Sequence, residues 1–420
     1  MKVLWFTNSP CGSVRRFSES VKTGGWMISL EDKIKKVPDI NLFVAYISSK
    51  KEQPFKYDGV MYYPIDPNIP QNKIGRVLYR FASLKSHEAI LLPQLLRIVN
   101  IVKPDLIHIH GTEECFGLIL NYINHIPIAI SIQGLLAPYK EKFFAGISEF
   151  KIKKYESLFD KIKGISYIRD YKILTQKAKR EINYLNNTKY IFGRTSWDRD
   201  ITKLFNSKGK YFIVNEILRT PFYQVQWNKN KFSEKIKLVS IISIGIYKGY
   251  ETLLKAANLI SKYANFQFEW NIIGYQLNDR CARLTHKITK LNPTDNNVKF
   301  LGRLDAKGIA KVLLDSDIYC HVSHIENSPN SVCEAMILGM PIIASNVGGT
   351  QSLLENKLEG LLYQDGDPYV LAANIVYLVS HFNEAKQMGY NARKRALYRH
   401  DASRVVRELT SAYNNILLNK

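Results

Sequence analysis

Short apolar runs alternate with helical patterns along the whole chain, and this alternation restricts the fold more than any other feature. Strands and helices in repeated succession build parallel sheets that are covered by helices. We predict strands at Val3 to Asn8, Leu42 to Ser48, Leu106 to His110, Ile128 to Ile132, Tyr190 to Gly193 and Phe212 to Asn215 in the first half, and at Leu238 to Ile244, Phe268 to Ile273, Val298 to Leu301, Ile318 to Val322, Ile342 to Ser345 and Gly360 to Tyr363 in the second. The expected class is α/β, with two domains of similar architecture.

The domains are expected to divide near residue 216. The stretch from Ile217 to Lys235 is polar and contains Pro221, which interrupts the periodic pattern in the way that a linker does. We therefore predict one domain over residues 1–216 and a second over residues 217–401.

Composition excludes several classes of protein. The chain has 420 residues, of which 46% are hydrophobic, so cores of ordinary size can form. The five cysteines are odd in number and lack close-paired spacing, which argues against a disulfide framework or a zinc cluster and favours the cytoplasm. No run of eighteen apolar residues occurs, so no transmembrane helix is expected.

The formal charge of +22 is high for a soluble enzyme, and such a field attracts nucleic acid, anionic lipid or acidic substrates. Residues 140–180 hold 12 basic and 5 acidic side chains, a net charge of +7 (12 − 5). Apolar residues recur there at helical spacing, from Phe144 and Ile147 to Phe159 and Ile162. This pattern predicts either a basic amphipathic helix at an anionic membrane or a core-facing helix with a solvated lysine face.

The residues that point most directly to chemistry are Glu326-Asn327-Ser328-Pro329-Asn330-Ser331-Val332-Cys333-Glu334. Ser328 suits a helix N-cap, and Pro329 suits the first helical position. Gly339 is expected to end the same helix. The sequence therefore predicts a short helix whose N-terminus opens onto a site.

That helix would place two carboxylates and three backbone donors together. The unpaired N–H groups of Asn330, Ser331 and Val332 are expected to point outward and to hold a diphosphate. Glu326 precedes the helix and would lie at the mouth of the site, while Glu334 lies inside the helix, within reach of sugar or ribose hydroxyls. Two carboxylates at this spacing are more often a solvated helix face, so the neighbouring motifs decide the interpretation.

Ligands of doubly wound sheets bind beyond the carboxyl ends of the strands. This rule selects the loops at Gly24-Gly25, Gly111-Thr112, Gln133-Gly134, Arg194-Thr195, Glu216, Lys248-Gly249, Glu326 to Val332 and Gly348-Gly349.

The Glu326 to Glu334 segment resembles the E-x7-E signature of family-4 retaining glycosyltransferases, which have the GT-B fold. Val298-Lys299-Phe300-Leu301-Gly302-Arg303, Gly339 to Gly349 and Glu359-Gly360-Leu361-Leu362 agree with the same family. The resemblance is strong from about Lys237 to Leu378. It implies two Rossmann-like domains facing each other across a cleft, the first binding the acceptor and the second the nucleotide-sugar donor, with a last helix at about 402–420 packed back on the first domain.

The resemblance also implies catalytic roles. Glu326 would hold the transferred sugar, Glu334 the ribose, and Lys248 the negative charge of the leaving diphosphate. Many family members carry an arginine six residues before this lysine, where the present chain has Ile242, so a second cation is missing. Arg303 is a candidate replacement near the donor.

In the first domain, Gly24 and Gly25 follow the first strand, where a residue without Cβ lets the backbone approach a phosphate. The family has a similar glycine-rich loop, although two glycines alone are more often a plain turn.

His108 and His110 point to the same side of one strand, so a metal site has to be considered. No third ligand has an established spacing, and the resemblance implies a metal-independent enzyme. His110 is then expected to line the acceptor pocket.

Three further residues are candidates for the acceptor side. Gln133 stands where many family members have a histidine; it can hydrogen-bond a sugar hydroxyl but cannot act as a base. Arg194 and Glu216 resemble positions in bacterial polysaccharide glycosyltransferases and would position substrate, the alternative being a buried structural ion pair. Arg194 is also an alternative second cation for the diphosphate.

The predicted function is transfer of a sugar from a nucleoside diphosphate sugar to an acceptor hydroxyl with retention of configuration, in bacterial surface polysaccharide synthesis. The acceptor would be a glycan or lipid-linked glycan, no metal or other cofactor is expected, and the enzyme would be cytoplasmic or peripheral on the inner face of the membrane. An epimerase or hydrolase of nucleotide sugars and a non-catalytic nucleotide-sugar binding protein stay open. A nucleic-acid partner is not expected, since no zinc-finger or RNA-recognition signature accompanies the charge.

Overall fold

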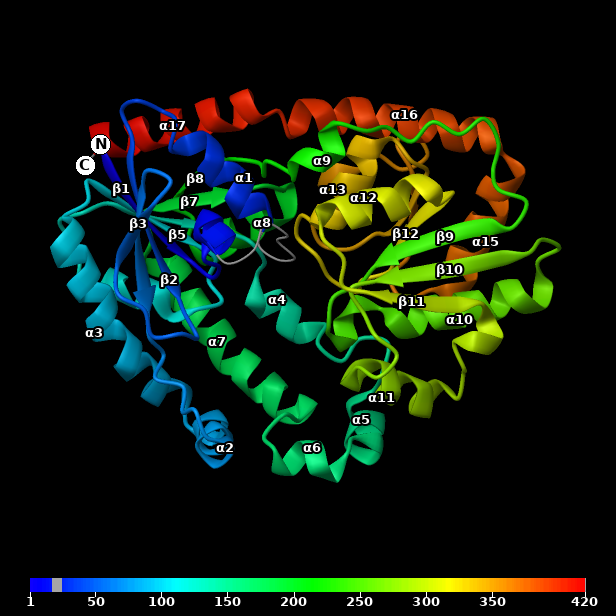
Figure 1. The fold of residues 1–420 in the computed structure, drawn as a ribbon, viewed down its shortest axis with the longest axis horizontal. Helices are drawn as coiled ribbons and strands as arrows, with labels where there is room; N and C mark the ends of the chain where they lie inside the picture. Colours follow the sequence, from blue (N-terminus) through cyan, green and yellow to red (C-terminus); the bar gives the residue numbers. More distant parts are fainter. Residues whose placement is uncertain (17–24, 420) are drawn as a thin grey trace. The chain divides into compact units, whose positions relative to one another are not determined.

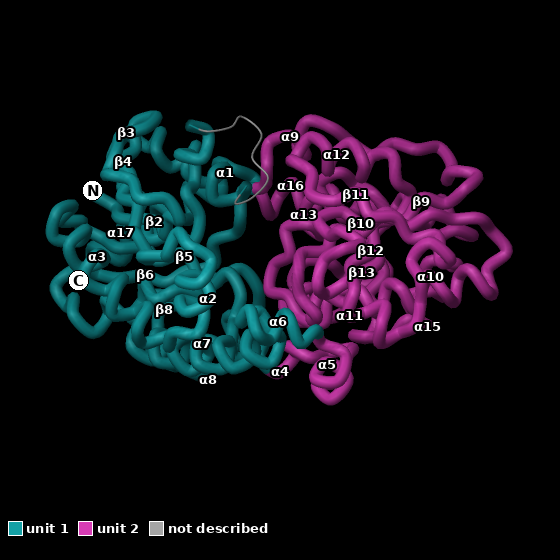
Figure 2. The backbone as a smooth tube through the Cα atoms, turned by 60° about the horizontal axis from the view of Figure 1, so that its bottom comes forward, with its two compact units in different colours: residues 1–140, 157–217, 401–420 teal, residues 141–156, 218–400 magenta. Residues whose placement is uncertain are grey.

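The computed structural model describes residues 1–16 and 25–419. The chain forms two compact units (Figure 2). Unit 1 contains residues 1–140, 157–217 and 401–420, and unit 2 contains residues 141–156 and 218–400. The segment 141–156 departs from the predicted division, which assigned it to the first domain.

Unit 1 is built on an eight-stranded sheet in the order β3-β4-β2-β1-β5-β6-β7-β8, in which only the β3–β4 pair is antiparallel (Figure 1). The strands are β1 (Lys2–Thr7), β2 (Asn41–Ile47), β3 (Phe55–Tyr57), β4 (Val60–Ile65), β5 (Leu106–His110), β6 (Ile128–Ser131), β7 (Tyr190–Gly193) and β8 (Lys210–Ile213). All six predicted strands of this half are present. The β3–β4 hairpin was not predicted, although its Asp58-Gly59 turn is a recognised hairpin signal.

Helices lie on both faces of this sheet, but α2 and α6 contain no buried residue. The helices of this unit are η1 (Cys11–Arg16), α1 (Gly25–Ile34), α2 (Lys73–Phe81), α3 (Leu84–Val102), η2 (Cys115–Asn121), α4 (Leu136–Glu141), α6 (Leu158–Ile162), α7 (Tyr167–Asn187), α8 (Ser196–Phe205) and α17 (Ala402–Leu418). Alternate residues of β1 enter different cores, as a two-residue period requires. Leu4 and Phe6 pack with α3, η2 and α7, whereas Val3 and Trp5 pack with α1 and α17. Helix α17, at the red end of the chain, contacts α1 (Figure 1).

Unit 2 has a six-stranded, fully parallel sheet in the order β11-β10-β9-β12-β13-β14. Its strands are β9 (Ile236–Ile241), β10 (Phe268–Ile273), β11 (Val298–Gly302), β12 (Ile318–His321), β13 (Ile342–Ser345) and β14 (Leu361–Tyr363), so the six predicted strands are confirmed. The helices are α5 (Glu149–Tyr155), α9 (Thr220–Tyr223), η3 (Ile246–Lys248), α10 (Tyr250–Tyr263), α11 (Arg280–Thr289), η4 (Thr294–Asn296), α12 (Ala306–Asp315), α13 (Asn330–Leu338), α14 (Thr350–Leu353), α15 (Pro368–Ser380) and α16 (Phe382–Arg399). One core joins α9, α12, α13 and α16 to the sheet.

The stretch predicted as a linker is packed rather than free. Leu218, Phe222 and Trp227 are buried in the core of unit 2, and the indole N–H of Trp227 donates to the Ser316 carbonyl at 2.8 Å. Polar residues separate these three apolar residues in the sequence, so no periodic apolar pattern predicted that the stretch would be packed.

The basic segment 140–180 is not the single amphipathic helix that its spacing suggested. It is divided among α4, α5, α6 and α7, with Ser148 and Ser166 as side-chain N-caps of α5 and α7. Gly146 and Gly164 have φ of 79° and 68° and interrupt the helical backbone. No helix among the described residues has both the length and the apolar character needed to cross a bilayer.

Candidate active site

Lys248 and Glu326 lie at the ends of two neighbouring strands of unit 2. Strand β9 leads into η3, which ends at Lys248, and β12 leads into the loop that carries Glu326. Because β9 and β12 are parallel neighbours, their carboxyl ends meet at one edge of the sheet. The Lys248 Nζ lies 2.5 Å from Glu326 Oε1, so the structure brings together the two residues predicted to be catalytic.

This pair is charged in a largely buried environment. Burial raises the pKa of Glu326, but the interactions with Lys248 and His321 together outweigh it and lower that pKa to about 2. Burial also acts to lower the pKa of Lys248, and the Glu326 carboxylate reverses the direction, so this pKa is raised. The Ser323 hydroxyl donates to Glu326 Oε1 at 3.0 Å. A fixed cation beside a fixed carboxylate is therefore present at neutral pH.

Two glycines hold the loops around this pair in close backbone contact. Gly249 has φ of 76°, and a Cβ there would lie 1.7 Å from the Val322 carbonyl oxygen. Gly348 has φ of 50°, and a Cβ there would lie 1.9 Å from the Glu326 carbonyl oxygen. That same carbonyl accepts the Gly349 N–H at 3.0 Å. Both positions thus require glycine to keep Lys248 and Glu326 where they are.

The predicted helix after Glu326 exists as α13, and it begins one residue later than expected. Pro329 is the N-cap, so Ser328 precedes the cap instead of forming it. Gly339, with φ of 80°, ends the helix as predicted.

The N-terminal turn of α13 offers fewer free donors than expected. The Val332 N–H donates to the Pro329 carbonyl at 3.0 Å, so its prediction as an unpaired phosphate donor is wrong. The N–H groups of Asn330 and Ser331 donate no such backbone hydrogen bond within the described part of the chain, so their role as phosphate donors stays a prediction. Asn330 Oδ1 is buried without a hydrogen-bond partner among the described residues. A helix start with open donors and an unpaired amide oxygen is suited to a polar ligand.

Glu334 lies on the buried side of α13 and already has a strong partner. Both of its oxygens accept hydrogen bonds from Arg219, through Nε and Nη2, each at 2.7 Å. Burial raises the pKa of Glu334, and the Arg219 charge opposes that rise. Ribose binding by Glu334 therefore stays a prediction, because this geometry shows a structural ion pair. Arg219 was not anticipated, since it belongs to the stretch interpreted as a linker.

A second unanticipated residue, His324, lies two positions before Glu326. Its Nε2 is 2.7 Å from Glu251 Oε1, and its Nδ1 is 2.6 Å from Asp365 Oδ1. Lys142, in the 141–156 segment, contacts the other Asp365 oxygen at 2.8 Å. Burial acts to lower the pKa of His324, but the two carboxylates outweigh it and raise that pKa to about 9. His324 thus ties the Glu326 loop to α10 and to the loop after β14.

This arrangement predicts a pH-dependent stability. A histidine whose pKa is raised on folding stabilises the protein fully below its unfolded pKa of about 6.5, and that stabilisation is lost as pH rises through about 9. Across this pH window, we expect the free energy of unfolding of the wild type to fall by on the order of 3 kcal/mol, which is the upper limit set by the pKa shift of His324. The melting temperature of His324→Gln should be lower at pH 6.5 and converge on the wild type near pH 10. His381→Gln, at an exposed position, is the control, and parallel pH profiles of wild type and His324→Gln would contradict the assignment.

In unit 1, His108 and His110 are buried core residues at the end of β5. His108 uses both ring nitrogens, with Tyr413 Oη and Ser131 Oγ each 2.6 Å away, which leaves it no nitrogen for a metal. Burial lowers the pKa of His108 to about 3 and also lowers the pKa of His110. Neither ring nitrogen of His110 has a hydrogen-bond partner among the described residues.

The other candidates of unit 1 gather around Trp26, which the sequence interpretation missed. The Arg194 guanidinium lies 4.1 Å from the Trp26 ring, and the His110 ring lies 6.2 Å from it. Arg194 Nε is 3.6 Å from Glu216 Oε2, and both side chains are buried. Gln133 Nε2 donates to the His110 carbonyl at 3.1 Å, which joins the loop after β6 to the end of β5. The signal for Trp26 was its place directly after Gly24-Gly25.

Three candidates, Gly24, Gly25 and Arg303, keep only the status of predictions. Gly24 lies outside the described residues, and Gly25 is the first residue of α1. Arg303 is exposed at the end of the edge strand β11, with β10 between that strand and β9. Among residues 1–16 and 25–419, Lys248 and Glu326 form their ion pair with each other and not with Arg303, so the role of Arg303 as second cation stays a prediction.

The fold of the whole chain is shared with solved glycosyltransferases. The chain is similar to sucrose-phosphate synthase from Thermosynechococcus elongatus over 100% of both chains, with a TM-score of 0.75 and 14% identity. It is also similar to Anabaena HepE in complex with UDP-glucose, over 99% of this chain and 100% of the other, with a TM-score of 0.67 and 18% identity. The predicted GT-B class, with two Rossmann-like domains, is thereby confirmed.

The match to a known protein family lies within unit 2. Residues 224–395 match the family described as Glycosyl transferases group 1, so the predicted resemblance to glycosyltransferases is confirmed for this part of the chain. A relative is the amylovoran biosynthesis glycosyltransferase AmsK of Erwinia amylovora, 26% identical over 156 residues, which are 36% of this chain and 37% of AmsK. The chain covers 41%, 37% and 51% of the first curated relatives that it matches.

Proposed function

We propose that the protein transfers a sugar from a nucleoside diphosphate sugar to an acceptor hydroxyl, with unit 2 binding the donor and unit 1 the acceptor. The observation that carries this proposal is the Lys248–Glu326 pair at the carboxyl edge of the unit 2 sheet. The acceptor is a glycan or a lipid-linked glycan of a bacterial surface polysaccharide, in keeping with the relationship to AmsK.

The chemistry follows from where charge develops. Departure of the diphosphate builds negative charge, which Lys248 and the N-terminal turn of α13 stabilise electrostatically. The sugar gains positive charge at its anomeric carbon, and the Glu326 carboxylate favours that charge while accepting hydrogen bonds from the sugar hydroxyls. The preformed pair has to open when donor binds, because Lys248 exchanges Glu326 for phosphate oxygens.

Retention of configuration fits the residues present on the acceptor side. Gln133 has no acid–base chemistry, and burial keeps His110 neutral by lowering its pKa. A departing phosphate oxygen is then the base that accepts the acceptor's proton, on the same face as the leaving group. This route requires no metal or organic cofactor, and an unchanged rate after chelation is expected.

A donor panel tests the proposal. Uridine diphosphate sugars are tried first, because HepE was solved with UDP-glucose. A donor at one hundred times its Kd is expected to stabilise the protein by about 2.7 kcal/mol, which a thermal shift detects. Release of nucleoside diphosphate should then require an acceptor, and product NMR should show the donor's anomeric configuration.

The panel also separates the alternatives. Free sugar or an isomerised nucleotide sugar formed without acceptor would indicate a hydrolase or an epimerase. Stabilisation without turnover, across all acceptors tried, would indicate a binding protein.

A further inference from the structure

Helix α2 of unit 1 leaves its apolar residues in solvent. Ile74, Leu78 and Phe81 are 76%, 66% and 53% exposed, and the helix contains no buried residue. Their spacing of four and three places them on one face. Lys73, Arg76 and Arg80 recur at the same spacing on the adjoining face. This helix is therefore amphipathic without covering a core of its own.

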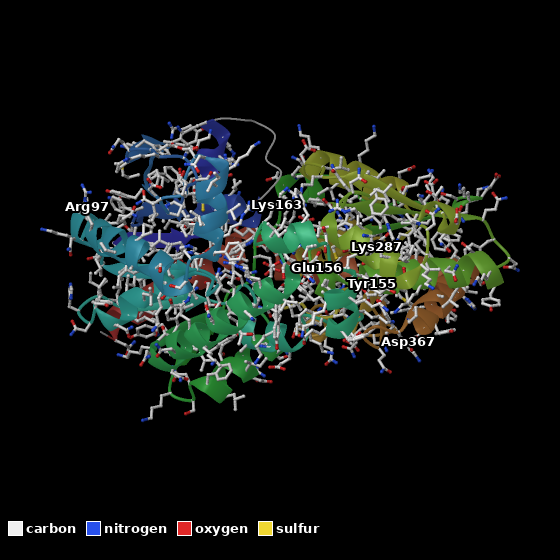
Figure 3. All side chains as sticks on the ribbon, turned by 90° about the horizontal axis from the view of Figure 1, so that it is seen from below. Arg97, Tyr155, Glu156, Lys163, Lys287 and Asp367 are labelled. Carbon is white, nitrogen blue, oxygen red and sulfur yellow. The ribbon has the colours of Figure 1, made fainter. Side chains whose placement is uncertain are left out.

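Helix α6 exposes a second set of apolar side chains. Leu158, Phe159 and Ile162 are 72%, 63% and 64% exposed. The Lys163 Nζ lies 3.8 Å from the centroid of the Phe159 ring (Lys163 is labelled in Figure 3). A cation above an exposed ring is an arrangement typical of interfaces between water and an apolar phase.

The two helices meet in one surface. Arg80 Nη1 donates to the Lys163 carbonyl at 3.1 Å, and the Arg169 guanidinium lies 5.3 Å from the Phe81 ring. The first contact joins the end of α2 to the turn between α6 and α7, and the second joins it to α7. We name as the α2–α6 patch the residues Lys73, Ile74, Arg76, Leu78, Arg80, Phe81, Leu158, Phe159, Asp160, Lys161, Ile162 and Lys163.

We propose that the α2–α6 patch docks on an anionic membrane surface. Six exposed apolar side chains on adjoining short helices form the kind of patch that marks an interaction site. The patch holds five basic residues and one acidic residue, so its charge complements a negatively charged bilayer. Leu, Ile and Phe on one side with Lys and Arg on the other is the pattern of helices that lie in the interface plane.

A neighbouring cavity of about 390 Å³ gives this surface a function. Tyr79 and Arg80 line it from α2, Arg169 and Lys177 from α7, and Asn8 and Ile47 from the ends of β1 and β2. Arg80 belongs to both the patch and the cavity wall. Glu88 and Glu114 also line the cavity, and they pair with Arg180 and Lys177 at 2.8 and 3.2 Å. The membrane would therefore present an amphiphilic acceptor at the cavity. This assignment of the acceptor's class rests on the proposed function, whereas membrane binding does not.

Cosedimentation of the full chain with vesicles tests the docking surface. Binding to vesicles of phosphatidylcholine with phosphatidylglycerol should exceed binding to phosphatidylcholine alone, and should weaken as salt is raised. Leu78→Ser with Phe159→Ser should lower vesicle affinity about tenfold or more. The control is Leu204→Ser, a 78% exposed leucine of α8, which should bind as the wild type does.

The charge of the patch is tested separately with Lys73→Glu and Arg76→Glu. We expect loss of the preference for anionic vesicles, while Arg97→Glu on α3 keeps it; Arg97 lies away from Lys163 in Figure 3. Patch variants should keep the wild-type melting temperature and donor-induced stabilisation, which separates this proposal from the function of unit 2. Equal vesicle binding by wild type and patch variants, or no binding to anionic vesicles, would overturn it.

The acceptor class has its own measurement. Vesicles matched in surface charge, with and without a polyprenyl phosphate, should differ in affinity for the wild type, and Lys177→Gln should reduce that difference. Equal affinities would reject the amphiphile assignment and leave the docking surface standing.

Discussion

Lys248→Ala is expected to lower kcat by about 10²–10³, the loss typical of removing one electrostatic contact to a developing anion. In the proposed mechanism Lys248 stabilises the departing diphosphate, and its ammonium group lies 2.5 Å from Glu326 Oε1. The rate is measured with the donor and acceptor found by the panel, at saturating donor. Lys307→Ala, at an exposed lysine of α12, is the matched control and should keep full activity.

Glu326→Gln should cause a loss of the same order, because an amide cannot stabilise positive charge on the sugar. Glu355→Gln, an exposed glutamate, is its control. Both active-site variants remove one partner of a buried pair, so melting temperatures have to accompany the rates. A folded variant at either position with near wild-type turnover would reject the mechanism, whereas loss of both activity and folding would call for Lys248→Arg instead.

The second large effect concerns stability. Arg219→Met should lower the free energy of unfolding by about 3 kcal/mol, since it leaves Glu334 buried without its bidentate partner. This figure is at the low end for buried pairs, because the Arg219 side chain is 19% exposed. Urea denaturation measures the loss. Arg395→Met is the comparison, since Arg395 pairs with Glu359 at 3.2 Å and is 37% exposed, and it should cost about 1 kcal/mol or less.

The Arg219→Met deficit should depend on pH in a defined direction. Burial already raises the pKa of Glu334, and loss of the arginine raises it further. A protonated carboxyl needs no counter-charge, so the deficit should narrow as pH falls from about 8 to about 5. Adding Glu334→Gln to Arg219→Met should recover much of the loss, and failure to recover would show that Arg219 acts through packing instead.

Most of the fold followed from local pattern, and the two fold features that were missed also have local signals. Apolar runs located twelve strands, and Gly339 located the end of α13. The β3–β4 hairpin was not predicted, because the Asp58-Gly59 pair was not considered as a hairpin turn. The helix inferred from Phe144 to Ile162 failed because Ser148 and Gly146 interrupt it, and both are local signals.

The site was predictable only in part. Lys248 and Glu326 stand in motifs, so their order along the chain was enough to propose that they meet. Arg219, the partner of Glu334, is 115 residues away along the chain. Glu251, the partner of His324 that belongs to α10, is 73 residues away. A single sequence carries no sign of such pairings, and nothing in the chain marked Arg219 or His324 as special.

The position of α17 has a consequence for biosynthesis. The Trp5 indole N–H donates to the Tyr413 hydroxyl at 3.0 Å across 408 residues, and α17 supplies Val405, Leu409 and Ile416 to the same core. Synthesis proceeds from the N-terminus, so β1 leaves the ribosome long before α17, and this core stays incomplete until α17 has been synthesised. The core of unit 2, complete by residue 400, is available earlier to the nascent chain. The order of folding is thus expected to run opposite to the order of translation.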